Sequence, residues 1–109
     1  MQSSKILKDL RKRTIKTYMD IFILGQLQEN PLSGYDLIGL IHSRFDILVS
    51  SGTIYSLLYS LERDGLIKGV QDQRKRVYKL TEKGERAIPV LVQANGEIQN
   101  CLKNMLILS

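Results

Sequence analysis

Residues 51–64 combine apolar side chains with an unusual number of hydroxyl and tyrosine side chains. If they form a helix, each residue advances it by about 100°, so the apolar side chains share one face and the others lie opposite. The apolar face holds Ile54, Leu57, Leu58 and Leu61. The opposite face holds Gly52, Thr53, Tyr55, Ser56, Tyr59, Ser60 and Arg63. Short hydroxyl side chains allow close approach to a DNA groove and can bond phosphate oxygens or base edges, so this face is a candidate reader of the major groove.

The beginning of the same helix is suited to an anion. Its first backbone N–H groups have no intrahelical partner and lie at the positive end of the helix dipole. Ser50, Ser51 and Thr53 can help to hold a phosphate there. Alternatively, the serines only cap the helix, and Tyr55 and Tyr59 only cover neighbouring helices.

Basic residues form two clusters that lie far apart in the sequence. The first consists of Lys5, Lys8, Arg11, Lys12, Arg13 and Lys16, with Asp9 as the only acid among them. The second is Arg74, Lys75 and Arg76, between two predicted strands. A basic ribbon tip can lie on the DNA backbone or in the minor groove beside a recognition helix, although many charged loops are merely solvated. The formal net charge of +5 agrees with a polyanionic partner.

Together these features define one set of candidate DNA-binding residues. The set is Lys16, Tyr35, Ser50, Ser51, Gly52, Thr53, Tyr55, Ser56, Tyr59, Arg74, Lys75 and Arg76. We expect specificity from Thr53, Tyr55, Ser56 and Tyr59. Phosphate contacts are expected from Lys16 and the three ribbon residues.

Helices must position these residues, and their limits can be predicted. Apolar spacing predicts a helix over residues 14–29, ended by Asn30–Pro31, and a separate amphipathic arm over residues 3–13. Ser33 is the predicted N-cap of a second helix that runs to about Arg44. Ser50 or Ser51 caps the third helix, which runs to Asp64 and stops at Gly65.

A ribbon and a long helix follow. Two short strands are predicted over residues 66–70 and 77–80, separated by a polar segment over residues 71–76. Thr81 is the predicted cap of a last helix that runs toward Leu108. Because Pro89 falls within it, we expect a bend or break near residue 88.

This order of elements predicts the fold class. It is a mainly α fold with a small β-ribbon, namely a winged helix-turn-helix domain plus a C-terminal dimerisation helix. The expected organisation is a basic N-terminal arm or helix at 1–13, the DNA-binding domain at 14–81 and the dimerisation helix at 82–109. The dimer is predicted from an apolar stripe with a mean spacing near that of a helix seam, although a core helix within one subunit would also be apolar. The stripe is Leu91, Ala94, Ile98, Cys101, Leu102, Met105 and Leu108.

Several classes of function are excluded by residue counts. With one cysteine, Cys101, and one histidine, His42, the chain offers no internal disulfide, no zinc cluster and no nucleophile–histidine–acid set. We therefore expect no enzyme, no catalytic residue, no metal and no cofactor. Neither a secretory signal nor an apolar run of about 20 residues is present, which predicts a cytoplasmic protein that does not enter membranes.

Four motifs, in this order, resemble those of the PadR-like transcriptional regulators. They are SGYDL at 33–37, SGTIYSLL at 51–58, LERDGLI at 61–67 and RVYKLTEKG at 76–84. The similarity extends over about residues 18–109 and is greatest to the short form, with one helix after the wing. The resemblance implies a homodimer whose C-terminal helices pack together and place two recognition helices on a palindromic operator. It also implies a repressor, which is the more frequent role in this family.

The sequence departs from the family pattern at two places. No glycine lies between Val70 and Arg76, where family members often carry a glycine-rich stretch, so the reach of the wing into the minor groove is open. No aromatic residue follows Tyr78, which argues against the stacking of flat drugs between subunits seen in some relatives. Whether another small-molecule effector exists is left open.

Two further hypotheses compete with specific DNA binding. The helix face could dock a protein or an RNA, in which case salt-dependent binding to duplex DNA would be absent. The basic arm could associate with an anionic membrane, but it carries few apolar residues.

Overall fold

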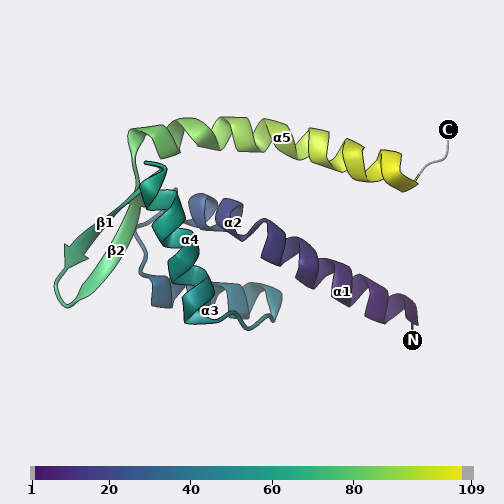
Figure 1. Ribbon diagram of the computed structural model, residues 1–109, viewed down its shortest axis with the longest axis horizontal. Coiled ribbons are helices and arrows are strands. Elements are labelled where there is room, and N and C mark those ends of the chain that lie inside the picture. The colour runs from purple at the N-terminus through teal and green to yellow at the C-terminus, as the bar shows by residue number, and fades with distance from the viewer. Residues whose placement is uncertain (1, 107–109) are drawn as a thin grey trace.

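The computed structural model describes residues 2–106, and side chains are described from residue 4 onward. The helices are α1 (Gln2–Thr17), α2 (Met19–Leu27), α3 (Gly34–Phe45), α4 (Ser51–Arg63) and α5 (Glu82–Leu106). The strands β1 (Ile67–Asp72) and β2 (Lys75–Leu80) form an antiparallel hairpin between α4 and α5. In Figure 1 the hairpin extends from one end of the molecule, and α1 and α5 extend from the other. The predicted order of helices, ribbon and long helix is confirmed.

The core lies where α2, α3, α4 and the base of the hairpin meet. Its buried side chains are Met19, Ile23, Leu24, Leu27, Leu37, Ile41, Ile54, Leu58, Leu61, Ile67 and Tyr78. At its edge Phe22 and Phe45 meet edge to face, with ring centroids 5.2 Å apart. The apolar face predicted for residues 51–64 is thus buried at Ile54, Leu58 and Leu61 and partly buried at Leu57.

The first helical region differs from the prediction. The predicted helix over 14–29 is wrong, because α1 continues to Thr17 and the break falls at Tyr18, with φ −108° and ψ 25°. The hydroxyls of Thr14 and Thr17 donate to the carbonyls of Leu10 and Arg13, each at 2.8 Å. Such bonds bend helices, and they precede the break.

The caps of α3 and α4 agree with the prediction. The Ser33 side chain accepts from the amide of Asp36, whose carboxylate accepts from the amide of Ser33, each at 3.0 Å. Ser50 caps α4 by accepting from the amide of Thr53 at 3.1 Å. Gly65 follows α4 with φ +79°, a left-handed conformation that disfavours side chains.

The hairpin is longer than predicted. Residues 71, 72, 75 and 76, expected in a loop, pair across the ribbon, and only Gln73 and Arg74 form the turn. At the other end, Tyr78 exchanges two backbone hydrogen bonds with Leu32, at 2.8 and 3.1 Å. The hairpin of β1 and β2, called the wing from here on, is therefore anchored to the segment before α3.

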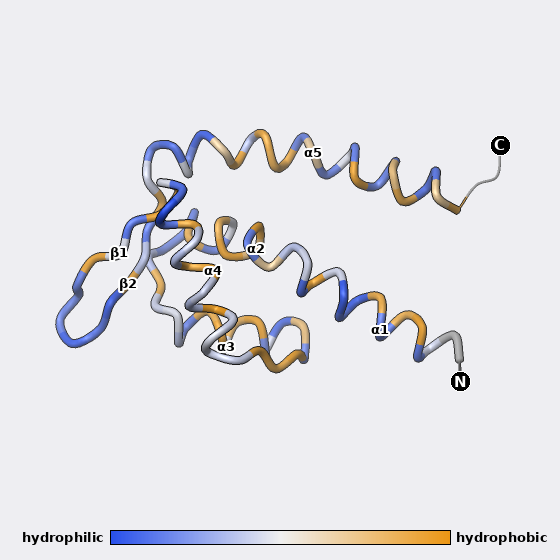
Figure 2. Tube along the Cα trace, viewed as in Figure 1, coloured by the Kyte–Doolittle hydropathy of each residue, from blue (hydrophilic) through white to orange (hydrophobic). Residues whose placement is uncertain are grey.

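Helix α5 begins as predicted but is not broken. The Thr81 hydroxyl accepts from the amide of Gly84 at 3.1 Å. Of the bend or break expected near residue 88, the break is wrong, since one helix runs from Glu82 to Leu106 through Pro89. Proline removes a single i→i−4 hydrogen bond, and the remaining backbone bonds of this long helix carry it past that position. Apolar and polar residues alternate along this helix in Figure 2.

Candidate nucleic-acid interface

The polar face of α4 is open to solvent. Thr53, Tyr55, Ser56 and Tyr59 are all exposed, and Tyr59 retains 67% of its accessible surface. This agrees with the division of the helix made from the sequence. A helix held by one face and bare on the other can enter a groove without disturbing the core.

The Tyr55 ring packs on the beginning of α3. A Cβ added to Gly34 would lie 2.6 Å from the Tyr55 ring, so glycine provides the space that this ring occupies. Tyr35, the next residue, is 82% exposed. The structure thus seats the Tyr55 ring of α4 on the first residue of α3, one position before Tyr35.

Lys16 lies near the start of α4. With Ser50 and Thr53 it lines one surface hollow, floored by Met19 and Val49. Because the first amides of α4 are free of intrahelical bonds, this hollow combines a cation, hydroxyls and a helix N-terminus. A Cβ on Gly52 would meet only the Ser50 hydroxyl, at 3.9 Å, so packing within the chain does not require glycine there.

The wing is tied to α3 through Lys75. Its ammonium lies 3.5 Å from the Asp36 carboxylate. The hydrogen bond from the Ser33 amide, with Lys75 as a smaller contributor, lowers the pKa of Asp36 below its usual value. The carboxylate therefore stays ionised near neutral pH, and it partly offsets the charge of Lys75.

The wing is tied to α4 through Arg76. Its guanidinium lies 3.1 Å from the Glu62 carboxylate and 5.6 Å from the centre of the Tyr78 ring. The same carboxylate accepts from the Gly69 amide at 3.0 Å. A Cβ at Gly69 would overlap the guanidinium, so Arg76 lies flat on the ribbon. The Arg76 guanidinium is thus engaged within the chain, and its contacts with Glu62 and Tyr78 position the wing.

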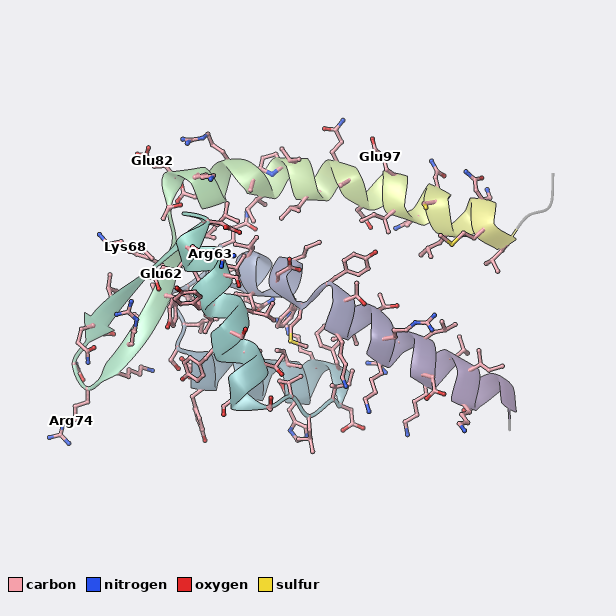
Figure 3. The ribbon with its side chains drawn as sticks, viewed as in Figure 1. Glu62, Arg63, Lys68, Arg74, Glu82 and Glu97 are labelled. Atoms are coloured by element: carbon pink, nitrogen blue, oxygen red, sulfur yellow. The ribbon has the colours of Figure 1, made fainter. Side chains whose placement is uncertain are left out.

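Arg74 differs from its two neighbours. It projects from the tip of the ribbon in Figure 3, and none of the ion pairs found among residues 4–106 includes it. Gln73 turns the chain there with φ +57°. Of the three predicted wing residues, Arg74 is the one presented to a partner without a competing carboxylate.

Sequence reasoning missed three residues that arrange this surface. Asp36 holds Lys75, Glu62 holds Arg76, and Gly34 seats Tyr55. The capping pattern Ser33-x-x-Asp36 could have drawn attention to Asp36. Glu62 and Arg76 lie 14 positions apart, and no local pattern links them.

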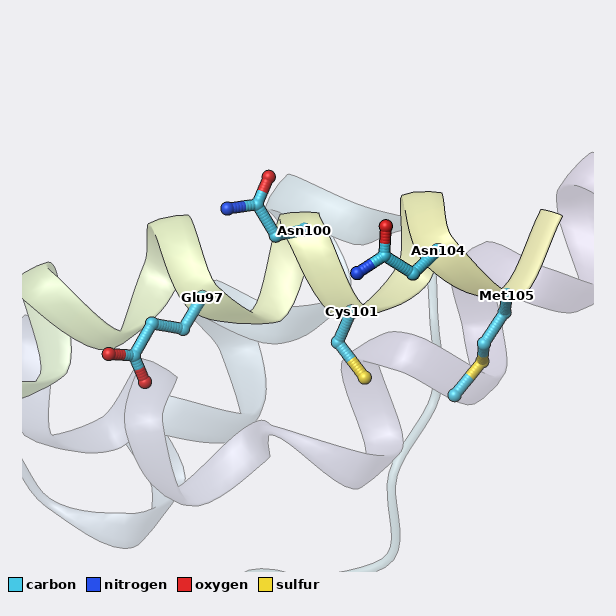
Figure 4. A pocket seen from close by; sticks show the side chains of 5 residues that line it. All are labelled: Glu97, Asn100, Cys101, Asn104 and Met105. Atoms are coloured by element: carbon cyan, nitrogen blue, oxygen red, sulfur yellow. The ribbon is translucent and has the colours of Figure 1, made fainter. Parts of the chain in front are cut away.

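The expected dimer stripe lies along α5. Leu91, Ala94 and Ile98 are half-buried, while Leu102 and Met105 are 55% and 71% exposed. Leu108 lies outside the described residues. A shallow hollow beside exposed Cys101 is lined by Glu97, Asn100, Asn104 and Met105, all from α5, and Figure 4 shows Cys101 and Met105 on the same side of the helix.

Residues 2–106 present neither a cluster of metal ligands nor a membrane-spanning helix. No group of three or more potential metal ligands occurs within this range. None of the helices described there combines the length and apolarity that crossing a membrane requires.

Known proteins resemble this chain in sequence and in fold. Residues 23–89 match the model of the transcriptional regulator PadR-like family. A transcriptional regulator from Clostridium thermocellum has a TM-score of 0.74 at 24% identity, over 89% of this chain and 97% of that one. A PadR family transcription regulator from Clostridium difficile has a TM-score of 0.69 at 26% identity, over 83% and 99%. Bacillus subtilis PadR in complex with operator DNA has a TM-score of 0.59 at 26% identity, over 68% and 46%. No curated protein matches the sequence.

The similarities confirm the predicted fold class, a winged helix with a C-terminal helix.

Proposed function

Because this chain belongs to the PadR-like family of transcriptional regulators, we propose that it binds a specific operator in duplex DNA through the polar face of α4 and the wing. The observation that carries this proposal is the exposed face of α4, whose start adjoins Lys16 of α1 and presents the Ser50 hydroxyl and an unobstructed Gly52. Because Gly52 has no side chain, the first turn of α4 can approach DNA closely. The complex of Bacillus subtilis PadR with operator DNA adds support.

The residues divide into two roles. Thr53, Tyr55, Ser56 and Tyr59 read bases, because they lie on the exposed face of α4. Phosphates are held by the start of α4, by Lys16 and by Arg74. Tyr35 lies beside this surface and contacts the backbone, whereas Lys75 and Arg76 chiefly hold the wing in place.

We further propose that the protein acts as a homodimer joined along α5. Ile88 and Leu91 pack on the core of their own subunit, while the same stripe continues past them to exposed Leu102 and Met105. A second copy would cover this continuation as a helix seam. The seam comprises Leu91, Ala94, Ile98, Cys101, Leu102, Met105 and Leu108.

Two-fold symmetry of the protein implies a palindromic operator. Occupation of such a site within a promoter would block transcription, so we propose that the protein is a repressor. We propose the cytoplasm as the compartment in which it meets its operator. No small-molecule effector forms part of this proposal.

The experiment is to probe fragmented genomic DNA with the purified full-length protein and to map the protected bases. We expect two protected half-sites related by a dyad, about one helical turn apart. Protection of a single half-site would contradict the dimer. If duplex DNA is not bound in a salt-dependent manner, docking of a protein or an RNA replaces the proposed function.

The wing makes a separate prediction. Arg74→Ala should weaken binding about equally for operator and unrelated DNA and should lower the slope of log Kobs against log salt by about one per subunit, because one phosphate contact is lost. Arg76→Ala should change this slope less, since its guanidinium is paired with Glu62. Fluorescence titrations at several salt concentrations measure both. Equal slopes for wild type and Arg74→Ala would exclude the phosphate contact.

A further inference from the structure

The lysines of α1 share one face. Lys5, Lys8, Lys12 and Lys16 recur at intervals of three and four residues, which places them within about 80° of one another around the helix. Ile6, Leu7 and Leu10 lie on the opposite side and are exposed. Among residues 4–106, no ion pair includes any of these four lysines. Asp9 borders this face and is the one acid in α1. The lysine face of α1, defined by these four residues, therefore carries a net positive charge.

This face is continuous with the surface proposed to bind DNA. Lys8 and Lys12 line a hollow with Arg11 and residues 45–48, which connect α3 to α4. One helical repeat further on, Lys16 lines the next hollow with Ser50 and Thr53 at the start of α4. In Figure 1, α1 points away from the wing, so it would extend the contact surface at the end opposite Arg74.

We propose that the lysine face of α1 binds the phosphate backbone of DNA that flanks each half-site, beyond the base pairs read by α4. This inference rests on the proposed function. Lys5 and Lys16 are 11 residues apart, a rise of about 16 Å, which matches roughly five base pairs along a duplex. Phosphate contacts of this kind add affinity and salt dependence without adding sequence specificity.

An anionic membrane fits the geometry less well. A helix at a bilayer surface buries its apolar side, and the exposed apolar side of α1 is small, since it consists of Ile6, Leu7 and Leu10. The lysines instead adjoin the start of α4. Duplex DNA seated on α4 would therefore bring its phosphates to the lysine face with no change in the fold.

The test compares two duplexes. One contains only the protected operator, and the other adds about ten base pairs of unrelated sequence at each end. The variant K5Q/K8Q/K12Q removes three charges from α1 while keeping residues with good helix propensity, and it leaves Lys16 in place. The matched control K83Q/R86Q/K103Q removes three exposed charges from α5, outside the surface proposed to bind DNA.

We expect wild type and control to bind the longer duplex more tightly and with a steeper salt slope than the shorter one. The α1 variant should lose this difference between the two duplexes. Its salt slope on the longer duplex should be lower than that of wild type by about one per lost contact in each subunit. Its binding to the shorter duplex should stay unchanged. Equal slopes for wild type and α1 variant on the longer duplex would overturn the inference and leave the proposed function intact. Failure of wild type to bind either duplex would overturn both. If wild type floats with vesicles of anionic lipid and the α1 variant does not, while both have the same salt slope on DNA, the lysine face binds membranes instead.

Discussion

Ser56→Glu should weaken operator binding by at least about 100-fold while leaving the protein folded. Ser56 lies in the middle of the exposed face of α4, opposite the buried side chains Ile54, Leu58 and Leu61. A carboxylate there would be pressed against the negative surface of the groove and would lose its hydration. A 100-fold loss of affinity corresponds to about 2.7 kcal/mol of binding free energy. Glutamate is a good helix former, so α4 itself should persist. Fluorescence anisotropy with labelled operator measures the affinity, and thermal unfolding monitors the fold.

The matched control for this variant is Gln93→Glu. It introduces the same charge on an exposed position of α5, a helix that the proposal keeps away from DNA. We expect its affinity to change by less than about threefold, because a distant exposed charge is screened by salt. If Ser56→Glu binds the operator as tightly as Gln93→Glu does, the face of α4 is not the reading surface.

Gly84→Ala should destabilise the protein by about 3 kcal/mol and lower its melting temperature by more than 10 °C. Gly84 is buried in the first turn of α5, and a Cβ there would overlap the carbonyl oxygen of Leu66 and approach Leu80 to 3.1 Å. The overlapped carbonyl cannot easily retreat. It accepts from the Thr81 amide at 3.1 Å, and the neighbouring Gly65 carbonyl accepts from the Thr81 hydroxyl at 2.6 Å.

Gly96→Ala, in the same helix, should change the stability of the protein in the opposite direction. Nothing lies within 4 Å of a Cβ at this position. Alanine should therefore stabilise α5 by about 0.5–1 kcal/mol through helix propensity alone. Denaturant and thermal unfolding at one protein concentration compare the two variants, since the stability of a dimer depends on concentration. Equal stabilities would contradict the close packing of α5 on the turn after α4.

The features that were predicted correctly are local ones. Ser33 and Ser50 cap helices because a side-chain oxygen reaches amides two or three positions away. The two faces of α4 follow from helical geometry, and the left-handed Gly65 follows from the freedom of glycine. Each of these features depends on residues within a few positions of one another.

The incorrect predictions concern where elements stop. Apolar spacing continues through Tyr18, so it could not show that α1 and α2 separate there. The polar residues at 71–76 were read as a loop, but in a two-stranded ribbon exposed to solvent they can pair as well as apolar ones. The pattern around Pro89 predicts a bend or break in α5, yet the helix continues, because proline removes only one of the many backbone hydrogen bonds of a helix of this length.

The sequence alone therefore determined the order of elements, the winged-helix class and the two faces of α4, because these depend on periodicity and on short-range hydrogen bonds. Only the tertiary structure decided what the basic residues do. It paired Lys75 with Asp36 and Arg76 with Glu62, left Arg74 at the tip, and brought Lys16 to the start of α4. These partners are separated by 14 to 39 positions, and only folding brings such distant charges within reach of one another.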